Sequence, residues 1–356
     1  MLKSIKIENF RCFPFFEMEQ LGRLNLIVGT NNSGKTSILE AIQLLLNLPA
    51  NVGVLDNIIL GRSEYIFNEE NQERDLVIRH LFYDHKIDFG SQFSIRGVND
   101  HNVPIEVVLS VEDIKTLNSD IESPTLCIKG ANNITDIPFK LSKEGVLSSD
   151  LLQMQYFRKS LAEPNSNIQF VNSSSLDTQE AIELFDELVL TSEEDLVTQS
   201  LQIIEPRIKR IAIVSSVRFR YVGSRGGFVV QFFDENKRIP IGSMGDGMWR
   251  MLGLALAIVN AKNGVLLIDE IDTGLHFTVM SDMWRMLWET AKRLNVQIFA
   301  TTHSNDCWQS LADIANAENP SEDGITIHRI EKGKPHSIVF TERQIAIAAE
   351  RNIEVR

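Results

Sequence analysis

The segment Gly29–Thr36, with the sequence GTNNSGKT, constrains the fold of this chain more than any other feature. It matches the phosphate-loop pattern GxxxxGK[ST], in which backbone N–H groups surround a polyphosphate. The apolar run Leu24–Val28 precedes it, and a helical pattern over Ser37–Leu46 follows it. Only between a strand and a helix do the loop amides and the positive helix end point at the same phosphates. A chance glycine-rich turn would not have Lys, Thr and both flanks in register, so we predict a nucleotide-binding protein.

Within this loop each residue type has an expected task. We expect Lys35 to reach the β- and γ-phosphates of ATP and the Thr36 hydroxyl to ligate Mg²⁺. The remaining candidate nucleotide-binding residues of the loop and the helix start are Gly29, Asn31, Asn32, Ser33, Gly34 and Ser37.

Bulk properties limit where such a protein works. The chain has 356 residues, which favours two lobes or a core with an insertion. Its net charge of −13 opposes non-specific adhesion to nucleic acid or anionic membranes, although a local basic groove is compatible with it. Three cysteines without a CxxC pair indicate reduced thiols, and the longest apolar run, Met251–Asn260, is too short to span a bilayer. We therefore expect a cytoplasmic protein with no membrane segment.

Hydrophobic periodicity predicts an α/β chain in three parts. Short alternating patterns from Leu76 to about Val111 indicate an antiparallel sheet, whereas Asp150–Ala162 and Thr178–Leu190 indicate helices. A short strand is expected at Ile168–Asn172, and a hairpin turn at Gly226-Gly227. The expected parts are 1–147 (phosphate loop plus antiparallel sheet), 148–206 (mostly helical insertion) and 207–356 (C-terminal part).

The apolar run Val265–Ile268 ends in Asp269 and Glu270, which are candidates for the hydrolytic centre. A phosphate loop needs an acid at the end of another strand to hold Mg²⁺, and Asp269 is placed for that role. Glu270 is a candidate general base for the attacking water. Two adjacent buried acids raise each other's pKa unless a cation lies nearby, which favours a metal–phosphate site over a strand that ends in solvated acids.

Two further segments add to this pattern. Ser243, Gly245 and Gly247 precede the helical pattern Met248–Val259, and glycines with a serine at a helix start form an anion-binding nest. His303 follows the strand pattern that begins at Val296, where its imidazole could contact a γ-phosphate. In the same region Trp284 and Trp288, one helical turn apart, are expected to pack in the core.

Together these segments resemble the ABC-type ATPase heads of the SMC and RecF group, and most closely the OLD-like (overcoming lysogenization defect) ATPases. The resembling segments lie near both ends of the chain and leave its middle poorly covered; they are Ile7–Phe13, Gly29–Thr36, Ser243–Gly247, Leu266–Glu270, Gly274–His276 and Thr302–Ser304. The resemblance implies a P-loop NTPase of the ABC-ATPase-head type that hydrolyses ATP to ADP and phosphate. Two departures are visible: the signature loop is SMGDG instead of SGGQ, with Asp246 near a phosphate, and His276 stands where many relatives have Asp.

The resemblance also implies residue roles and an assembly. Asp269 and Thr36 would hold Mg²⁺, Glu270 would be the catalytic carboxylate and His303 the switch histidine. Arg11 would contact nucleotide phosphate. Ser243, Gly245 and Gly247 would bind the γ-phosphate of a nucleotide held by a second head. We therefore expect a homodimer or higher homo-oligomer that closes around Mg-ATP and opens after hydrolysis.

OLD nucleases carry a metal-binding nuclease module after the ATPase head, but Cys307–Arg356 contains no Asp-x-Asp pair. We therefore expect an ATPase switch or scaffold for a separate effector, a nuclease or toxin in anti-phage defence. The alternative is a RecF-like repair ATPase that binds duplex DNA. It is supported by the basic residues Arg207, Lys209, Arg210, Arg218, Arg220 and Arg225, which equally fit a solvated strand face. A transporter ATPase is disfavoured by the divergent signature loop and the long insertion before it.

Overall fold

The architecture is that of a computed structural model, which describes residues 1–68, 73–113, 124–130, 137–148, 167–174, 176–214, 227–234, 237–317 and 324–356. The chain divides into two compact units. Unit 1 consists of Met1–Leu21, Asn31–Ser166 and Ile330–Ile338, and unit 2 of Gly22–Thr30, Asn167–Arg329 and Val339–Arg356. Each unit therefore combines segments that are far apart in the sequence.

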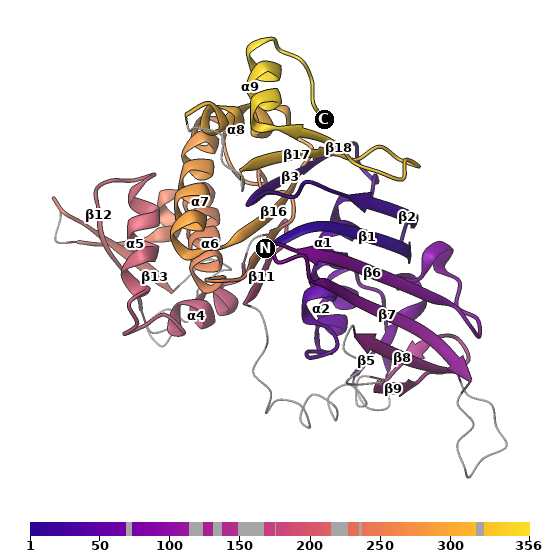
Figure 1. Ribbon diagram of the computed structural model, residues 1–356. Coiled ribbons are helices and arrows are strands. Elements are labelled where there is room, and N and C mark those ends of the chain that lie inside the picture. Colours follow the sequence, from indigo (N-terminus) through magenta and orange to yellow (C-terminus); the bar gives the residue numbers. More distant parts are fainter. Residues whose placement is uncertain are drawn as a thin grey trace. The chain divides into compact units, whose positions relative to one another are not determined.

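Unit 1 is built on a six-stranded antiparallel sheet with the strand order β2-β1-β6-β7-β8-β9 (Figure 1). Apolar and polar residues alternate along the strands of this sheet, so that one face is buried. In β1 the buried side chains are those of Leu2, Ile5, Ile7 and Phe10. The strands are β1 (Leu2–Phe10), β2 (Phe13–Met18), β6 (Gln92–Asn99), β7 (Pro104–Asp113), β8 (Pro124–Gly130) and β9 (Ile137–Lys140). The antiparallel sheet predicted for this part of the chain is thus confirmed.

Helix α1 (Lys35–Asn47) packs against β1, β6 and β7 of this sheet, and α2 (Val54–Gly61) packs against α1. Unit 1 also has a small sheet in the order β10-β5-β4. Its strands and the neighbouring short helices are β4 (Tyr65–Asn68), β5 (Glu73–Val77), β10 (Val146–Leu147), η1 (Ile78–Leu81) and η2 (Tyr83–His85).

Unit 2 contains a second six-stranded sheet, in the order β11-β15-β16-β3-β17-β18. Strands β11, β15, β16, β3 and β17 run parallel to one another, and every residue of β3, β15 and β16 is buried, as parallel strands covered on both faces require. The strands are β3 (Leu24–Val28), β11 (Ile168–Val171), β15 (Val265–Ile268), β16 (Gln297–Thr302), β17 (Ile325–Arg329) and β18 (Ile338–Thr341). Because the strands are parallel, the segments that follow β15 and β16 emerge at the same edge.

Helices α6 and α7 lie side by side in unit 2, next to this sheet (Figure 1). Trp284 and Trp288 of α7 are both buried, which confirms their predicted place in the core. The helices of unit 2 are α4 (Thr178–Asp186), α5 (Glu194–Gln202), α6 (Asp246–Asn260), α7 (Met280–Leu294), α8 (Asn305–Ala317) and α9 (Glu342–Glu350), with the short η4 (Ile241–Met244) and η5 (Phe277–Val279).

A third, antiparallel sheet in unit 2 has the order β12-β13-β14. Its strands are β12 (Ile208–Ile213), β13 (Phe228–Phe232) and β14 (Arg238–Pro240). The predicted helix Asp150–Ala162 and Gly226 of the predicted turn lie outside the described residues.

Candidate functional site

The phosphate-loop pattern lies between β3 and α1, the strand and helix that the chemistry requires. Gly34 immediately precedes α1 with φ of 99°, a left-handed conformation that favours glycine. A Cβ atom on Gly34 would lie 2.3 Å from Cζ of Phe13 and 2.8 Å from Sγ of Cys12. Glycine is therefore needed here both for its conformation and for its lack of a side chain.

The start of α1 carries features that fit a bound anion. The N-cap residue Gly34 supplies no side-chain cap to the first N–H groups of the helix. Lys35 and Ser37 are buried and Thr36 is half-buried. The Ser33 hydroxyl is also buried and has no hydrogen-bond partner among the described residues. A buried polar atom without a partner normally indicates a ligand or water, and the triphosphate of ATP would satisfy it.

In unit 2, the acid pair lies immediately after β15. The Asp269 Oδ1 atom accepts a hydrogen bond of 2.6 Å from the Thr301 hydroxyl, and that hydroxyl accepts one of 2.8 Å from the Glu270 amide. The Asp269 amide donates to the Val171 carbonyl. Glu270 has φ of 45°, an uncommon left-handed conformation for a residue other than glycine. Its side chain is 42% exposed, so Asp269 is fixed by the sheet while Glu270 remains open to solvent.

His303 lies directly after β16, the strand next to β15, with Ile268 opposite Ala300. Its Nδ1 atom is 3.8 Å from Oε1 of Glu270, so adjacent parallel strands bring the predicted carboxylate and histidine together. The His303 carbonyl also accepts a hydrogen bond of 2.6 Å from Nη1 of Arg356.

Asp272, which no sequence motif had singled out, belongs to the same edge. Its Oδ1 atom accepts a hydrogen bond of 2.5 Å from the Thr302 hydroxyl, so the two threonines that end β16 each hold one acid. The sequence sign of this arrangement was the run Thr301-Thr302-His303, which follows a strand pattern in the same way as the acids follow theirs.

Arg250, which was also not singled out from the sequence, is 1% exposed within the apolar stretch of α6. It donates hydrogen bonds to the carbonyls of Asn172, Asp269 and Glu270. Burial lowers the pKa of Arg250 to about 10, although the negative charges of Asp272, Asp269 and Glu270 act to raise it. The sequence sign of its special role was a single arginine inside an otherwise apolar helix pattern.

The predicted signature loop occupies the exposed start of α6. Ser243 lies in η4, and Gly245 precedes α6 with φ of 93° and no side-chain cap. Ser243 and Gly245 are exposed to solvent. A Cβ on Gly247 would lie 3.7 Å from Cδ2 of Leu275, which places the loop beside the segment after Glu270. His276 in that segment bonds the Thr278 hydroxyl through Nδ1 at 2.9 Å.

Arg11, predicted to contact phosphate, is 5% exposed in unit 1. Its Nη1 atom donates to both carboxylate oxygens of Glu64 at 2.6 and 2.7 Å, and its Nε lies 2.8 Å from Oε2 of Glu40. Arg62 in turn bonds Glu40 at 2.5 Å and Ser37 at 3.1 Å. Burial raises the pKa of Glu40, and the two arginines oppose that effect. The phosphate contact of Arg11 stays a prediction, because its guanidinium is engaged by carboxylates here.

Among the described residues no group of three or more His, Cys, Asp or Glu side chains could hold a metal ion by itself. Within the same described part of the chain, no helix has the length and apolar character needed to cross a membrane.

Comparisons with known proteins agree with these observations. A family model described as the AAA ATPase domain matches residues 1–156 and 149–307. A Helicobacter pylori protein described as "ATP/GTP phosphatase" is 23% identical over 337 residues, which is 86% of each chain. The DNA replication and repair protein RecF of Caldanaerobacter subterraneus is 26% identical over 201 residues, 52% of this chain and 50% of that protein.

The OLD nuclease of Thermus scotoductus is 50% identical over 46 residues, which is 13% of this chain and 8% of that protein. A solved SMC head bound to the C-winged helix domain of ScpA matches 96% of this chain and 98% of its own, with a TM-score of 0.51 and 13% identity. The predicted fold class, an α/β ABC-type ATPase head with an added antiparallel sheet, is thereby confirmed.

Proposed function

Because the chain belongs to the AAA ATPase domain family, we propose that it binds Mg-ATP at Gly29–Thr36 and hydrolyses it with Glu270. The observation that carries this proposal is the meeting of Glu270 and His303, at 3.8 Å, beside the fixed Asp269. The H. pylori relative, whose description is "ATP/GTP phosphatase", supports the same reaction.

The residues divide the work. Lys35 and the loop amides bind the phosphates, with Asn31, Asn32, Ser33 and Ser37 completing the loop and helix start. Thr36 and Asp269 would hold Mg²⁺, which neutralises charge on the β- and γ-phosphates. Glu270 orients the attacking water and accepts its proton. His303, 3.8 Å from Glu270, would report whether the γ-phosphate is present.

We further propose that two copies of the chain share each nucleotide. The exposed start of α6, with Ser243, Gly245 and Gly247, has the glycines and the serine of an anion-binding nest, and its first turn also contains the acid Asp246. In a head-to-tail homodimer it would bind the γ-phosphate held by the partner, so each site takes parts from two subunits. Loss of that phosphate would remove the contact and open the dimer.

The shared site predicts the outcome of Ser243→Arg. The arginine fills the anion nest, so ATP binding stays intact while turnover falls about 100-fold, the usual effect of losing one transition-state donor. Phosphate release and fluorescent-nucleotide binding measure the two effects, and Ser192→Arg, at an exposed serine elsewhere in unit 2, is the matched control.

Mixing two inactive variants sharpens this test. Lys35→Ala damages the phosphate loop and Ser243→Arg damages the signature loop. In a shared arrangement their mixed dimer contains one site with both parts intact, and turnover reappears. If Ser243→Arg leaves turnover unchanged, or if mixing never restores it, the shared site is wrong.

We propose that this nucleotide switch controls a separate effector, a nuclease or toxin in anti-phage defence. The local similarity to an OLD nuclease supports the proposal. The neighbouring reading frames test it: an adjacent nuclease or toxin gene supports the effector, whereas adjacent replication genes favour the repair alternative.

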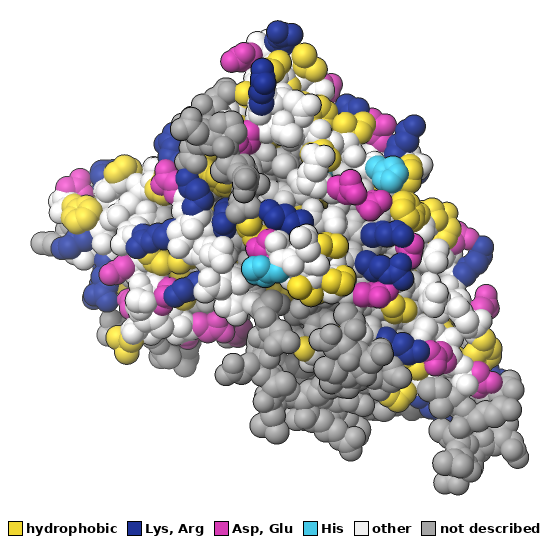
Figure 2. All heavy atoms as spheres, viewed as in Figure 1, with side chains coloured by type: hydrophobic (Ala, Val, Ile, Leu, Met, Phe, Trp, Pro, Cys, Tyr) yellow, Lys and Arg dark blue, Asp and Glu magenta, His cyan; other side chains and the backbone are white. Residues whose placement is uncertain are grey.

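The alternative function is a RecF-like ATPase that binds duplex DNA, and one surface favours it. Arg210, Gln231 and Arg238 lie opposite one another across β12, β13 and β14, while Ile211 and Val230 of the other face are buried. We call these three residues the basic row, because its two outer members, Arg210 and Arg238, are cations. Lys and Arg side chains gather over this part of unit 2 in Figure 2. The predicted contributors Arg218, Arg220 and Arg225 lie outside the described residues.

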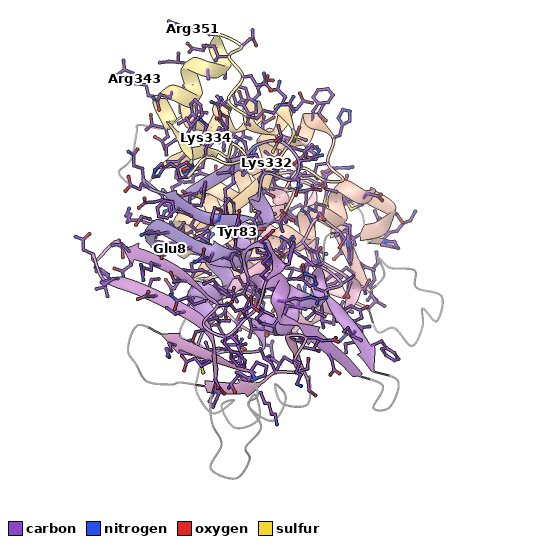
Figure 3. All side chains as sticks on the ribbon, turned by 90° about the vertical axis from the view of Figure 1, so that its right-hand side faces the viewer. Glu8, Tyr83, Lys332, Lys334, Arg343 and Arg351 are labelled. Atoms are coloured by element: carbon purple, nitrogen blue, oxygen red, sulfur yellow. The ribbon has the colours of Figure 1, made fainter. Side chains whose placement is uncertain are left out.

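The DNA alternative predicts that Arg210→Glu with Arg238→Glu weakens duplex binding at least about tenfold and lowers its salt dependence by about two phosphate contacts. Fluorescence anisotropy over a salt series measures both quantities. Lys332→Glu with Lys334→Glu, two exposed lysines of unit 1 (Figure 3), is the matched control. Binding that is absent, or equal in both double variants, rejects the basic row as a DNA site.

A further inference from the structure

Arg250 is a buried cation in a helix that is otherwise apolar on the same turns. Of α6, the residues Trp249–Val259 are all buried, and Arg250 is 1% exposed. A charged side chain removed from water is costly unless its donors are occupied. Helix packing alone does not explain an arginine at this position, because leucine or methionine would fill the same space.

The donors of Arg250 reach the ends of two neighbouring strands. Nη1 donates to the carbonyl of Asn172, just after β11, at 2.8 Å. Nη2 lies 3.3 Å from the carbonyls of both Asp269 and Glu270, just after β15. One planar guanidinium thus joins the edge of the parallel sheet to the backbone of the proposed Mg²⁺ ligand and of the proposed catalytic carboxylate. A guanidinium suits this task because its donors form a rigid fork.

This contact holds Glu270 in its unusual backbone conformation. The Glu270 amide donates to the Thr301 hydroxyl, and its carbonyl accepts from Arg250. A non-glycine residue with φ of 45° persists only where its surroundings hold it on both sides. Arg250 supplies one side of that restraint and β16 supplies the other.

The same helix begins at the signature loop. Arg250 lies three residues after Gly247 and seven after Ser243, within the first turns of α6. A displacement of the helix start is therefore carried directly to the carbonyls of Asp269 and Glu270.

We propose that Arg250 is a positioning residue that couples the signature loop to the hydrolytic acids. Binding of the partner's nucleotide to the loop fixes the position of α6. Arg250 then holds Glu270 where it can orient the attacking water. The inference rests on the proposed ATPase function and adds to it the path by which dimer closure governs turnover.

The experiment compares Arg250→Met and Arg250→Lys with wild type. In Arg250→Met, ATP affinity and KM stay within about threefold while kcat falls about 100-fold, since a small misplacement of a catalytic group has that effect. Arg250→Lys keeps a cation that can donate to one carbonyl and recovers about tenfold of the loss. Phosphate release, nucleotide binding and the mass of the Mg-ATP complex are measured for each variant.

Asn260→Ala is the matched control, because Asn260 also connects α6 to another element. Its Nδ2 atom donates a hydrogen bond of 3.0 Å to the Leu184 carbonyl, and among the described residues it bonds no acidic side chain. The substitution lowers the melting temperature and leaves kcat unchanged. The proposal is overturned if kcat of Arg250→Met stays within about twofold of wild type, or if its loss merely follows melting temperature as in Asn260→Ala. If Arg250→Met does not fold, Arg250→Lys decides by the same criterion.

Failure of the proposed function looks different. If wild type hydrolyses ATP and Glu270→Gln does not impair that reaction, the assignment of Glu270 is wrong, whatever Arg250 does. If Glu270→Gln stops turnover while both Arg250 variants match wild type, only the positioning role of Arg250 fails.

Discussion

Replacing Glu270 by glutamine is expected to lower ATP turnover by about 10²–10⁴-fold, the range that a positioned general base contributes. The amide keeps the shape of the side chain but cannot accept a proton from water. Glu270 is 42% exposed and forms no part of the core, so the substitution leaves folding and nucleotide binding intact. The bound triphosphate then persists, and the closed dimer accumulates.

Two measurements check this result: steady-state phosphate release, and molar mass by light scattering with saturating Mg-ATP. Glu289→Gln, at an exposed glutamate of α7, is the matched control and retains both turnover and the wild-type mass. A Glu270→Gln protein that stays monomeric with saturating Mg-ATP contradicts the proposal that two subunits share each nucleotide.

Replacing Arg11 by methionine is expected to destabilise the protein by about 3 kcal/mol, because Glu64 then loses its arginine partner and the buried Glu40 keeps only Arg62. Arg11 has 4% side-chain exposure, Glu40 5% and Glu64 17%, so little water is available to replace it. Glu40 is on α1, one turn after Thr36, and the loss therefore also loosens the helix that begins the phosphate loop.

Chemical denaturation measures the free energy of unfolding of this variant. Arg96→Met is the matched control: Arg96 pairs with Glu8 and Glu106 on an exposed sheet face (Glu8 is labelled in Figure 3), and its loss costs less than about 1 kcal/mol. If Arg11→Met instead keeps full stability and weakens ATP binding tenfold or more, Arg11 contacts phosphate as the sequence predicted, and the ion cluster is not its main role.

Local patterns predicted a large part of this protein. The strand, glycine loop and helix around Lys35 follow from contiguous residues, and so do the buried strand ending at Asp269 and the alternating strand β1. Their signals are periods of two or 3.6 residues and the special backbone needs of glycine, all of which are visible within a short window. The same local cues placed Trp284 and Trp288 in the core correctly.

Pairings between distant segments were not visible in that way. The sequence suggested a phosphate contact for Arg11, but the structure surrounds it with Glu40 and Glu64, 29 and 53 residues away in the chain. Which carboxylate meets which arginine depends on how α1 and the following segments pack, and no local period encodes that choice.

The sequence by itself indicated the class of chemistry, because the phosphate loop and the acid pair are contiguous motifs that can be recognised within a short window of the chain. Only the tertiary structure decided how that chemistry is supported. Parallel strands β15 and β16 bring His303 to Glu270, and Arg250 of α6 reaches the carbonyls beside them. Burial makes such contacts obligatory, since a guanidinium or carboxylate withdrawn from water must find partners wherever the packed chain provides them.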